Sequence, residues 1–144
     1  MVSFLFWNMN KKPLLNRVVR LVKHHEIDVL ILAECSIDPP EILDGLNLVG
    51  PSRYVLPTSE NRKIRIFTRA PVTSLTDVFR DINERIIIRR LKIADAPELL
   101  LVAAHLPSRR NWSRDDQTSY SSTVARPIIQ EEDKSGRKPS AEFS

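Results

Sequence analysis

The chain has 144 residues, of which 42% are apolar and 28% are charged, the composition of one ordinary globular domain. Its single cysteine, Cys35, excludes an internal disulfide, and the sequence has no Cys/His cluster that would suggest zinc, so we expect a reducing, cytoplasmic setting. The net charge of +4 mildly favours an anionic partner such as a phosphate-bearing substrate, and no apolar run approaches the roughly 18 residues that a membrane-spanning helix needs.

The first third of the chain predicts a strand, a helix and a second strand. Residues Ser3–Asn8 are apolar and aromatic, which indicates a buried strand. Apolar residues then recur at helical spacing over Leu14–His25, with charged residues on the opposite face. The run Val29–Ala33 is typical of a strand buried on both faces and is followed by Glu34. Together these elements predict a βαβ unit.

The middle of the chain changes to a sheet-rich pattern. Prolines and glycines leave room for one short helix at Glu41–Leu46. Short β-rich runs then predict three strands, at Arg53–Leu56, Ile64–Thr68 and Val72–Val78. Two further apolar runs, Arg85–Ile93 and Glu98–Leu106, are separated by four residues and predict an antiparallel hairpin.

The last part of the sequence predicts a helix and then a tail. Ser113 with Asp116 resembles a capping box, and three apolar residues follow at four-residue spacing, at Tyr120, Val124 and Ile128. Pro127 should end or kink this helix. We therefore expect a domain over residues 1–129 and a polar, disordered tail over residues 130–144.

Three polar residues stand where apolar strands end: Asn8, Glu34 and His105. A carboxylate in such a place can bind Mg²⁺, a histidine can contact a phosphoryl oxygen or move protons, and an amide can orient either group. Taken singly, each has a simpler reading: Glu34 as a surface carboxylate, His105 as a hydrogen-bonded boundary histidine and Asn8 as a turn residue. His24 and His25 are read as helix C-terminal residues that favour the helix dipole.

The three strand ends also resemble, in order, three motifs of the endonuclease/exonuclease/phosphatase (DNase I-like) family. The matching strings are FWN, ending at Asn8, DVLILAE, ending at Glu34, and LVAAHLPS around His105. The resemblance covers about Val2 to Ile129. It implies an α/β (α+β) fold, a two-sheet sandwich flanked by helices, of which this chain would hold the amino-terminal half.

The resemblance also implies a phosphoesterase site that uses Mg²⁺ or Mn²⁺. Glu34 would be the metal ligand, His105 would contact the scissile phosphate, and Asn8 would organise both. Arg85, and Arg114 with its R-x-x-Q helix entry, match weaker family positions and would be phosphate contacts. The substrate, which could be nucleic acid, a lipid or a small phosphoester, is left open.

The sequence departs from this family by lacking its G-D-x-N and S-D-H motifs. Those motifs supply the aspartate, asparagine and second histidine that handle the nucleophile and protons. We therefore expect a truncated member, weakly active or inactive alone. The alternatives are a non-catalytic binding module and a decayed fragment. Half of a sandwich would also expose apolar sheet surface and an unpaired edge, which favours self-association.

Overall fold

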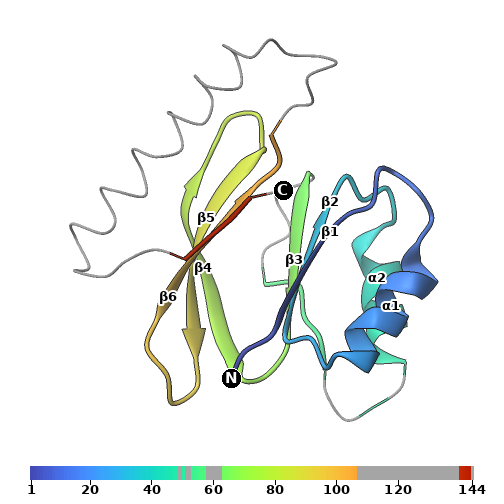
Figure 1. Cartoon of the computed structure of the whole chain (residues 1–144), viewed down its shortest axis with the longest axis horizontal. Helices are drawn as coiled ribbons and strands as arrows, with labels where there is room; N and C mark the ends of the chain where they lie inside the picture. Colours follow the sequence, from blue (N-terminus) through green and yellow to red (C-terminus); the bar gives the residue numbers. More distant parts are fainter. Residues whose placement is uncertain (49, 51–52, 58–62, 107–139, 144) are drawn as a thin grey trace.

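The computed structural model describes residues 1–48, 50, 53–57, 63–106 and 140–143. It stacks two helices on a three-stranded sheet, and a four-stranded sheet lies on the far side of that sheet (Figure 1). The fold is therefore α+β, with two sheets and helices on one side. None of the helices among the described residues is long and apolar enough to cross a membrane.

The first sheet has the strand order β1-β2-β3, formed by Phe4–Asn8, Val29–Ala33 and Ile64–Thr68. β1 and β2 are parallel, with Asn8 opposite Ala33, and β3 is antiparallel to β2. Every residue of β2 is buried, which explains its unbroken apolar run. The predicted βαβ unit is confirmed.

Two helices cover one face of this sheet: α1, Leu15–His24, and α2, Pro39–Asn47. α1 buries Val18 and Val22, which lie one helical turn apart and therefore on the same face. α2 begins with two prolines, which the first turn of a helix accepts because its N–H groups have no intrahelical partner. α1 is one residue shorter at each end than predicted, and α2 is longer than predicted by two residues at its start and one at its end.

The second sheet has the order β4-β5-β6-β7, formed by Val72–Arg80, Ile86–Ile93, Leu99–Ala104 and Ser140–Phe143. β5 and β6 form the predicted antiparallel hairpin. β7 runs parallel to β6, with Leu101 opposite Ser140. β6 is therefore paired on both sides, by β5 and by β7.

The alternating side chains of β2 divide the core into two layers. Leu30 and Leu32 face the helices, where they meet Val18 and Val22. Val29 and Ile31 belong to the second layer, with residues of β5 and β6 such as Ile87 and Leu101. Burying a side chain of this size stabilises the fold by about 1.5–3 kcal/mol. Residues at the ends of β2 are thus held from both sides.

Two predictions about structured segments were wrong. Arg53–Leu56 forms no strand; only Val55 makes an isolated bridge, to Thr68. The tail predicted to be disordered contains β7 at Ser140–Phe143. The predicted helix between residues 113 and 128 lies outside the described residues.

Candidate functional site

The ends of β1, β2 and β6 lie at the same edge of the molecule. Because β1 and β2 are parallel and Asn8 pairs with Ala33, Asn8 ends its strand beside Glu34. β6 brings His105 from the second sheet, and the His105 side chain reaches Glu34. Strand ends of this kind gather functional side chains, since the sheet fixes the backbone while the following turns leave room for a ligand.

The backbone holds Glu34 in an unusual conformation. Its φ is +48°, in the left-handed region that residues other than glycine rarely adopt. Its N–H donates to the Lys63 carbonyl at 3.2 Å, and its carbonyl accepts from the Lys11 N–H at 2.8 Å. Such a conformation costs on the order of 1–3 kcal/mol and persists only where neighbours enforce it. Here the segments on both sides of β2 enforce it.

The side chains of Glu34 and His105 meet directly. His105 Nε2 lies 2.7 Å from Glu34 Oε1, and the two side chains are 13% and 33% exposed respectively. The His105 backbone N–H donates to the Arg85 carbonyl at 2.7 Å. His105 is therefore positioned twice: Arg85, 20 residues away in the sequence, holds its backbone, and Glu34, 71 residues away, holds its ring.

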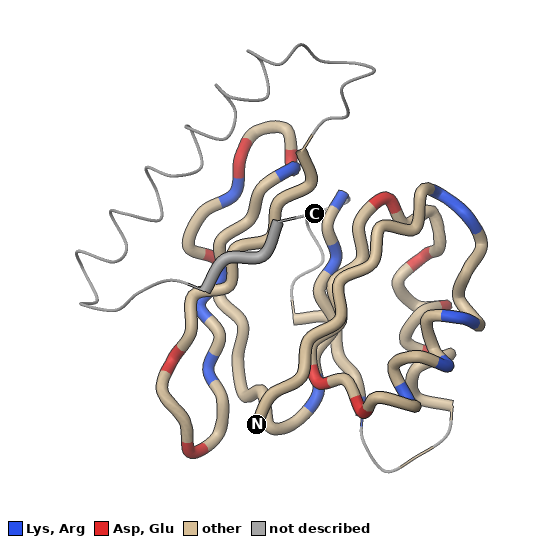
Figure 2. Tube along the Cα trace, viewed as in Figure 1, with Lys and Arg blue, Asp and Glu red and all other residues tan. Residues whose placement is uncertain are grey.

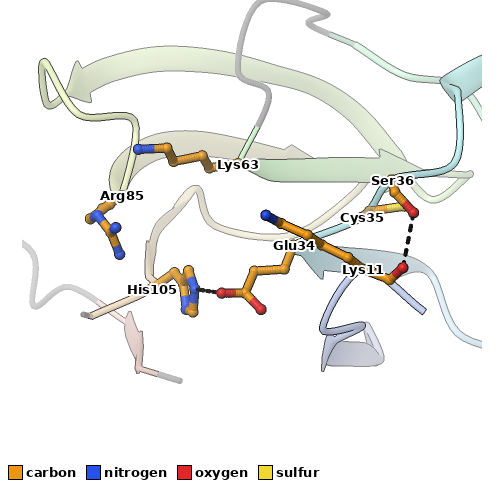
Figure 3. A pocket seen from close by; sticks show the side chains of 7 residues that line it. All are labelled: Lys11, Glu34, Cys35, Ser36, Lys63, Arg85 and His105. Carbon is orange, nitrogen blue, oxygen red and sulfur yellow. Dashed lines mark hydrogen bonds and ion pairs between the residues drawn. The ribbon is translucent and has the colours of Figure 1, made fainter. Parts of the chain in front are cut away.

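A cleft of about 270 Å³ opens around this pair (Figure 3). Its lining consists of Lys11, Glu34, Cys35, Ser36, Lys63, Arg85 and His105. Figure 3 shows Lys63 and Arg85 reaching, from the two sheets, toward the same end of the cleft. Three cationic side chains against one carboxylate give the cleft a positive character, which concentrates anions such as phosphate.

Lys11 and Lys63 are cleft residues that the sequence analysis missed. In the sequence they belong to a scattered excess of positive charge. They line the same cleft because Lys63 immediately precedes β3, and Lys11 lies in the turn that bonds to the Glu34 carbonyl. The one available hint was their position next to predicted strand ends.

Cys35 lines the cleft but is held as a neutral thiol. Burial raises its pKa, and a hydrogen bond to Ile37 and the charge of Arg65 oppose the rise more weakly. Its Sγ donates to the Ile37 carbonyl at 3.7 Å. A protonated thiol is a poor nucleophile and a poor metal ligand, so we assign Cys35 to packing.

Asn8 is at the same edge but has a local partner. Its Oδ1 accepts a hydrogen bond from the Asn10 N–H at 2.9 Å, an Asx-type turn that supports the left-handed conformations of Asn10 and Lys11. Asn8 is exposed and is not among the residues that line the cleft. Of the other expected contacts, Arg85 lines the cleft, whereas Arg114 lies outside the described residues.

The described residues contain no group of three or more His, Cys, Asp or Glu side chains that could hold a metal ion. A chelating cage of that kind is what zinc requires. Mg²⁺ differs, because it keeps several waters and uses only one or two protein carboxylates. Glu34 meets that smaller requirement: one oxygen contacts His105, and the side chain is 33% exposed.

Comparison of the fold with solved structures finds similar proteins. TDP2 from Caenorhabditis elegans superimposes with a TM-score of 0.55 at 20% identity, over 90% of this chain and 57% of that one. TDP2 from D. rerio in complex with a single-strand DNA product gives 0.57 at 17% identity, over 90% and 55%. An AP endonuclease from Archaeoglobus fulgidus gives 0.56 at 16% identity, over 93% and 52%.

These likenesses concern the fold. No protein-family model and no curated protein matches the sequence. The chain spans a little over half the length of the solved structures named above. It has the DNase I-like fold, and the predicted resemblance is confirmed at that level.

Proposed function

We propose that the cleft belongs to a Mg²⁺- or Mn²⁺-dependent phosphoester hydrolase site of the nuclease or phosphatase type. One observation carries the proposal. A carboxylate and an imidazole meet at 2.7 Å inside a cleft whose other charged side chains are all cationic. A phosphoester needs both kinds of group: cations and donors for its oxygens, and a carboxylate for the metal.

In this proposal Glu34 is the metal ligand, through the exposed part of its carboxylate. A bound Mg²⁺ would offset charge on the phosphate oxygens. His105 hydrogen-bonds a phosphoryl oxygen, and the Arg85 carbonyl fixes where its ring can reach. Arg85, Lys63 and Lys11 attract and orient the phosphate. Because the Asn8 oxygen accepts from the Asn10 N–H, the amide NH₂ group of Asn8 is left to donate to a phosphate oxygen.

We further propose that turnover by this chain is weak. The 144 residues contain neither a G-D-x-N nor an S-D-H motif, and the cleft lining includes no aspartate that could activate water. Losing a single transition-state donor typically costs about 10² to 10³ in rate. Losing the residues that activate the nucleophile should cost at least as much, although such effects are not additive.

Nucleic acid is the substrate class that we favour, and the support comes from the neighbours in fold. One is an AP endonuclease, and another was crystallised with a single-strand DNA product. A cytoplasmic setting, a domain over residues 1–129 to whose second sheet the tail adds β7, and self-association through sheet surface remain parts of the same proposal. They depend on the single cysteine, on the extent of the motifs, and on the share of the fold that the chain spans.

A non-catalytic binding module is the second candidate. The cation-lined cleft without a recognisable base favours it, as does the commitment of the Asn8 oxygen to its own turn. Both candidates bind phosphate groups. They differ in whether a bound phosphoester is cleaved.

The deciding experiment measures Mg²⁺-dependent cleavage of a single-stranded oligonucleotide and of a phosphomonoester, with Glu34→Gln as the test variant. Glu26→Gln is the matched control, since Glu26 also has a left-handed φ, of +49°, but lies before β2 instead of after it. We expect slow turnover that Glu34→Gln abolishes and Glu26→Gln preserves. Turnover that survives Glu34→Gln would contradict the assignment of hydrolysis to this cleft. Binding without turnover would favour the module.

A further inference from the structure

A second hollow, of about 400 Å³, lies on the helix side of the molecule. It is formed by Trp7 of β1 and four residues of α1, and its lining consists of Trp7, Arg17, Arg20, Leu21 and His24. The hollow shares no residue with the cleft around Glu34. Trp7 is only partly buried, although it also contacts the core beneath α1. One aromatic side chain thus lines the same hollow as two arginine side chains.

Every charged side chain on α1 is cationic. Within Leu15–His24 the charged side chains are Arg17, Arg20 and Lys23, and the helix has no acidic residue. α2 shows the reverse pattern, with Glu41 and Asp44 and no basic residue. An ordinary solvated surface mixes both signs. The segregation of charge onto two neighbouring helices therefore marks α1 as a surface for an anionic ligand.

Arg17 and Arg20 are available for such a ligand. Both are exposed, and no ion pair among the described residues involves either of them. They lie about 4.5 Å apart along the helix axis at the usual rise of an α-helix. Lys11 and Lys12 precede α1 in the turn after β1. Figure 2 shows this run of basic positions along the turn and the helix.

We propose that Trp7 and the exposed face of α1 form a second binding surface, which takes single-stranded nucleic acid. An unpaired base would stack on the Trp7 ring while Arg17 and Arg20 contact the flanking phosphates, as in other sequence-tolerant single-strand binders. A duplex would not offer a free base face to the hollow. Lys11 lines the cleft and also lies in the turn that leads to α1.

This surface does not depend on hydrolysis, and its test is made with a chelator present so that cleavage cannot contribute. A labelled fifteen-nucleotide oligothymidylate is titrated against wild type and against Arg17→Ala/Arg20→Ala. The control is Arg53→Ala/Lys92→Ala, which removes two exposed cations from other parts of the molecule, of which Lys92 pairs with Glu98 at 3.5 Å. We expect the α1 variant to bind about tenfold more weakly. The slope of log affinity against log salt concentration should fall in magnitude by about 1.4, because each phosphate contact contributes about 0.7. Equal losses in the two double variants would overturn the proposal.

The stacking part is tested through Trp7 itself. Trp112, the second tryptophan of the sequence, is replaced by phenylalanine so that fluorescence reports Trp7. We expect the oligonucleotide to quench this fluorescence and heparin, a polyanion without bases, to leave it unchanged. Trp7→Phe should retain most of the affinity, and Trp7→Leu should lose about 5- to 160-fold.

Two results would refute base stacking: equal quenching by heparin, or unchanged affinity in a Trp7→Leu variant that still melts cooperatively. Displacement of the oligonucleotide by vesicles of anionic phospholipid at matched charge would indicate a membrane surface instead and would also overturn the proposal. The arginine variants keep the test decisive if Trp7→Leu fails to fold, because their side chains are exposed.

Discussion

Asp28 is predicted to be a structural acid whose loss destabilises the first sheet. It is 7% exposed and precedes β2. Its Oδ2 accepts from the Ser3 N–H at 3.1 Å and from the Ser3 hydroxyl at 3.3 Å, and its Oδ1 accepts from Arg69 Nε at 3.0 Å. Ser3 precedes β1 and Arg69 follows β3. One carboxylate thus joins the three strands at the edge opposite the cleft.

The magnitude follows from these contacts. Hydrogen bonds to a charged group contribute about 1.5–3 kcal/mol each, and removing one partner of a buried ion pair typically costs about 3–5 kcal/mol. Arg69 is 16% exposed at its side chain, so solvent can partly replace the lost contact. We therefore expect Asp28→Ala to lower the free energy of unfolding by about 3–4 kcal/mol, a large share of the roughly 5–15 kcal/mol typical of a domain.

Urea unfolding followed by circular dichroism measures this loss. Asp28→Asn should cost less, because the amide oxygen still accepts from Ser3. The matched control is Asp44→Ala, an exposed acid of α2, which should change the unfolding free energy by less than about 0.5 kcal/mol. A loss below about 1 kcal/mol for Asp28→Ala would refute the reasoning, since it would mean that the three strands do not depend on the carboxylate.

Three further predictions concern buried polar groups. Arg89 is 2% exposed and lies 2.7 Å from the 44% exposed Asp77, so Arg89→Ala should lower the unfolding free energy by about 2–4 kcal/mol and Arg89→Met by less, measured by urea unfolding. Burial raises the pKa of Tyr54 above its ordinary 10.0, with Arg69 opposing and Asp28 adding to the rise, and its hydroxyl donates to the Ile27 carbonyl at 2.6 Å. Its stabilising contribution is therefore full below pH 10 and lost as the pH rises through the folded pKa; unfolding free energies should decline above about pH 10 in wild type and not in Tyr54→Phe. Burial also raises the pKa of Cys35, so iodoacetamide at pH 8 should alkylate the folded protein at least about tenfold more slowly than the urea-unfolded chain, and equal rates would contradict its assignment to packing.

The sequence predicted the first sheet well because local patterns determine it. β2 and β3 have their predicted bounds, since each is a short β-rich apolar run that the fold buries. Arg53–Leu56 has a similar pattern, but the strand predicted there was wrong for a reason that no local pattern shows. The Asn47 side chain accepts from the Tyr54 N–H at 2.7 Å and donates to its carbonyl at 3.0 Å. A side-chain amide thus occupies the groups that a strand partner would use.

β7 could not be predicted for a related reason. Its four residues are polar or small apart from Phe143, and what makes them a strand is the edge of β6, which their own composition does not reveal. The same limit applied to the cleft. Strand-end positions predicted that Glu34 and His105 would meet, whereas Lys11 and Lys63 required knowledge of which turns pack beside β2.

The string from Asp28 to Glu34 shows where sequence reasoning stops short of a functional assignment. Both acids flank the same buried strand, and although the family resemblance implies that Glu34 is the metal ligand, the residue pattern by itself gives no reason to prefer either. The structure separates them by what surrounds each carboxylate. Both oxygens of Asp28 accept hydrogen bonds from Ser3 or Arg69 in a buried setting, so this carboxylate is engaged in holding the strand ends together. Glu34 is a third exposed, contacts His105 through one oxygen and faces a cationic cleft. It is therefore Glu34 whose removal should abolish metal-dependent chemistry while leaving the fold intact, and Asp28 whose removal should unfold the sheet first.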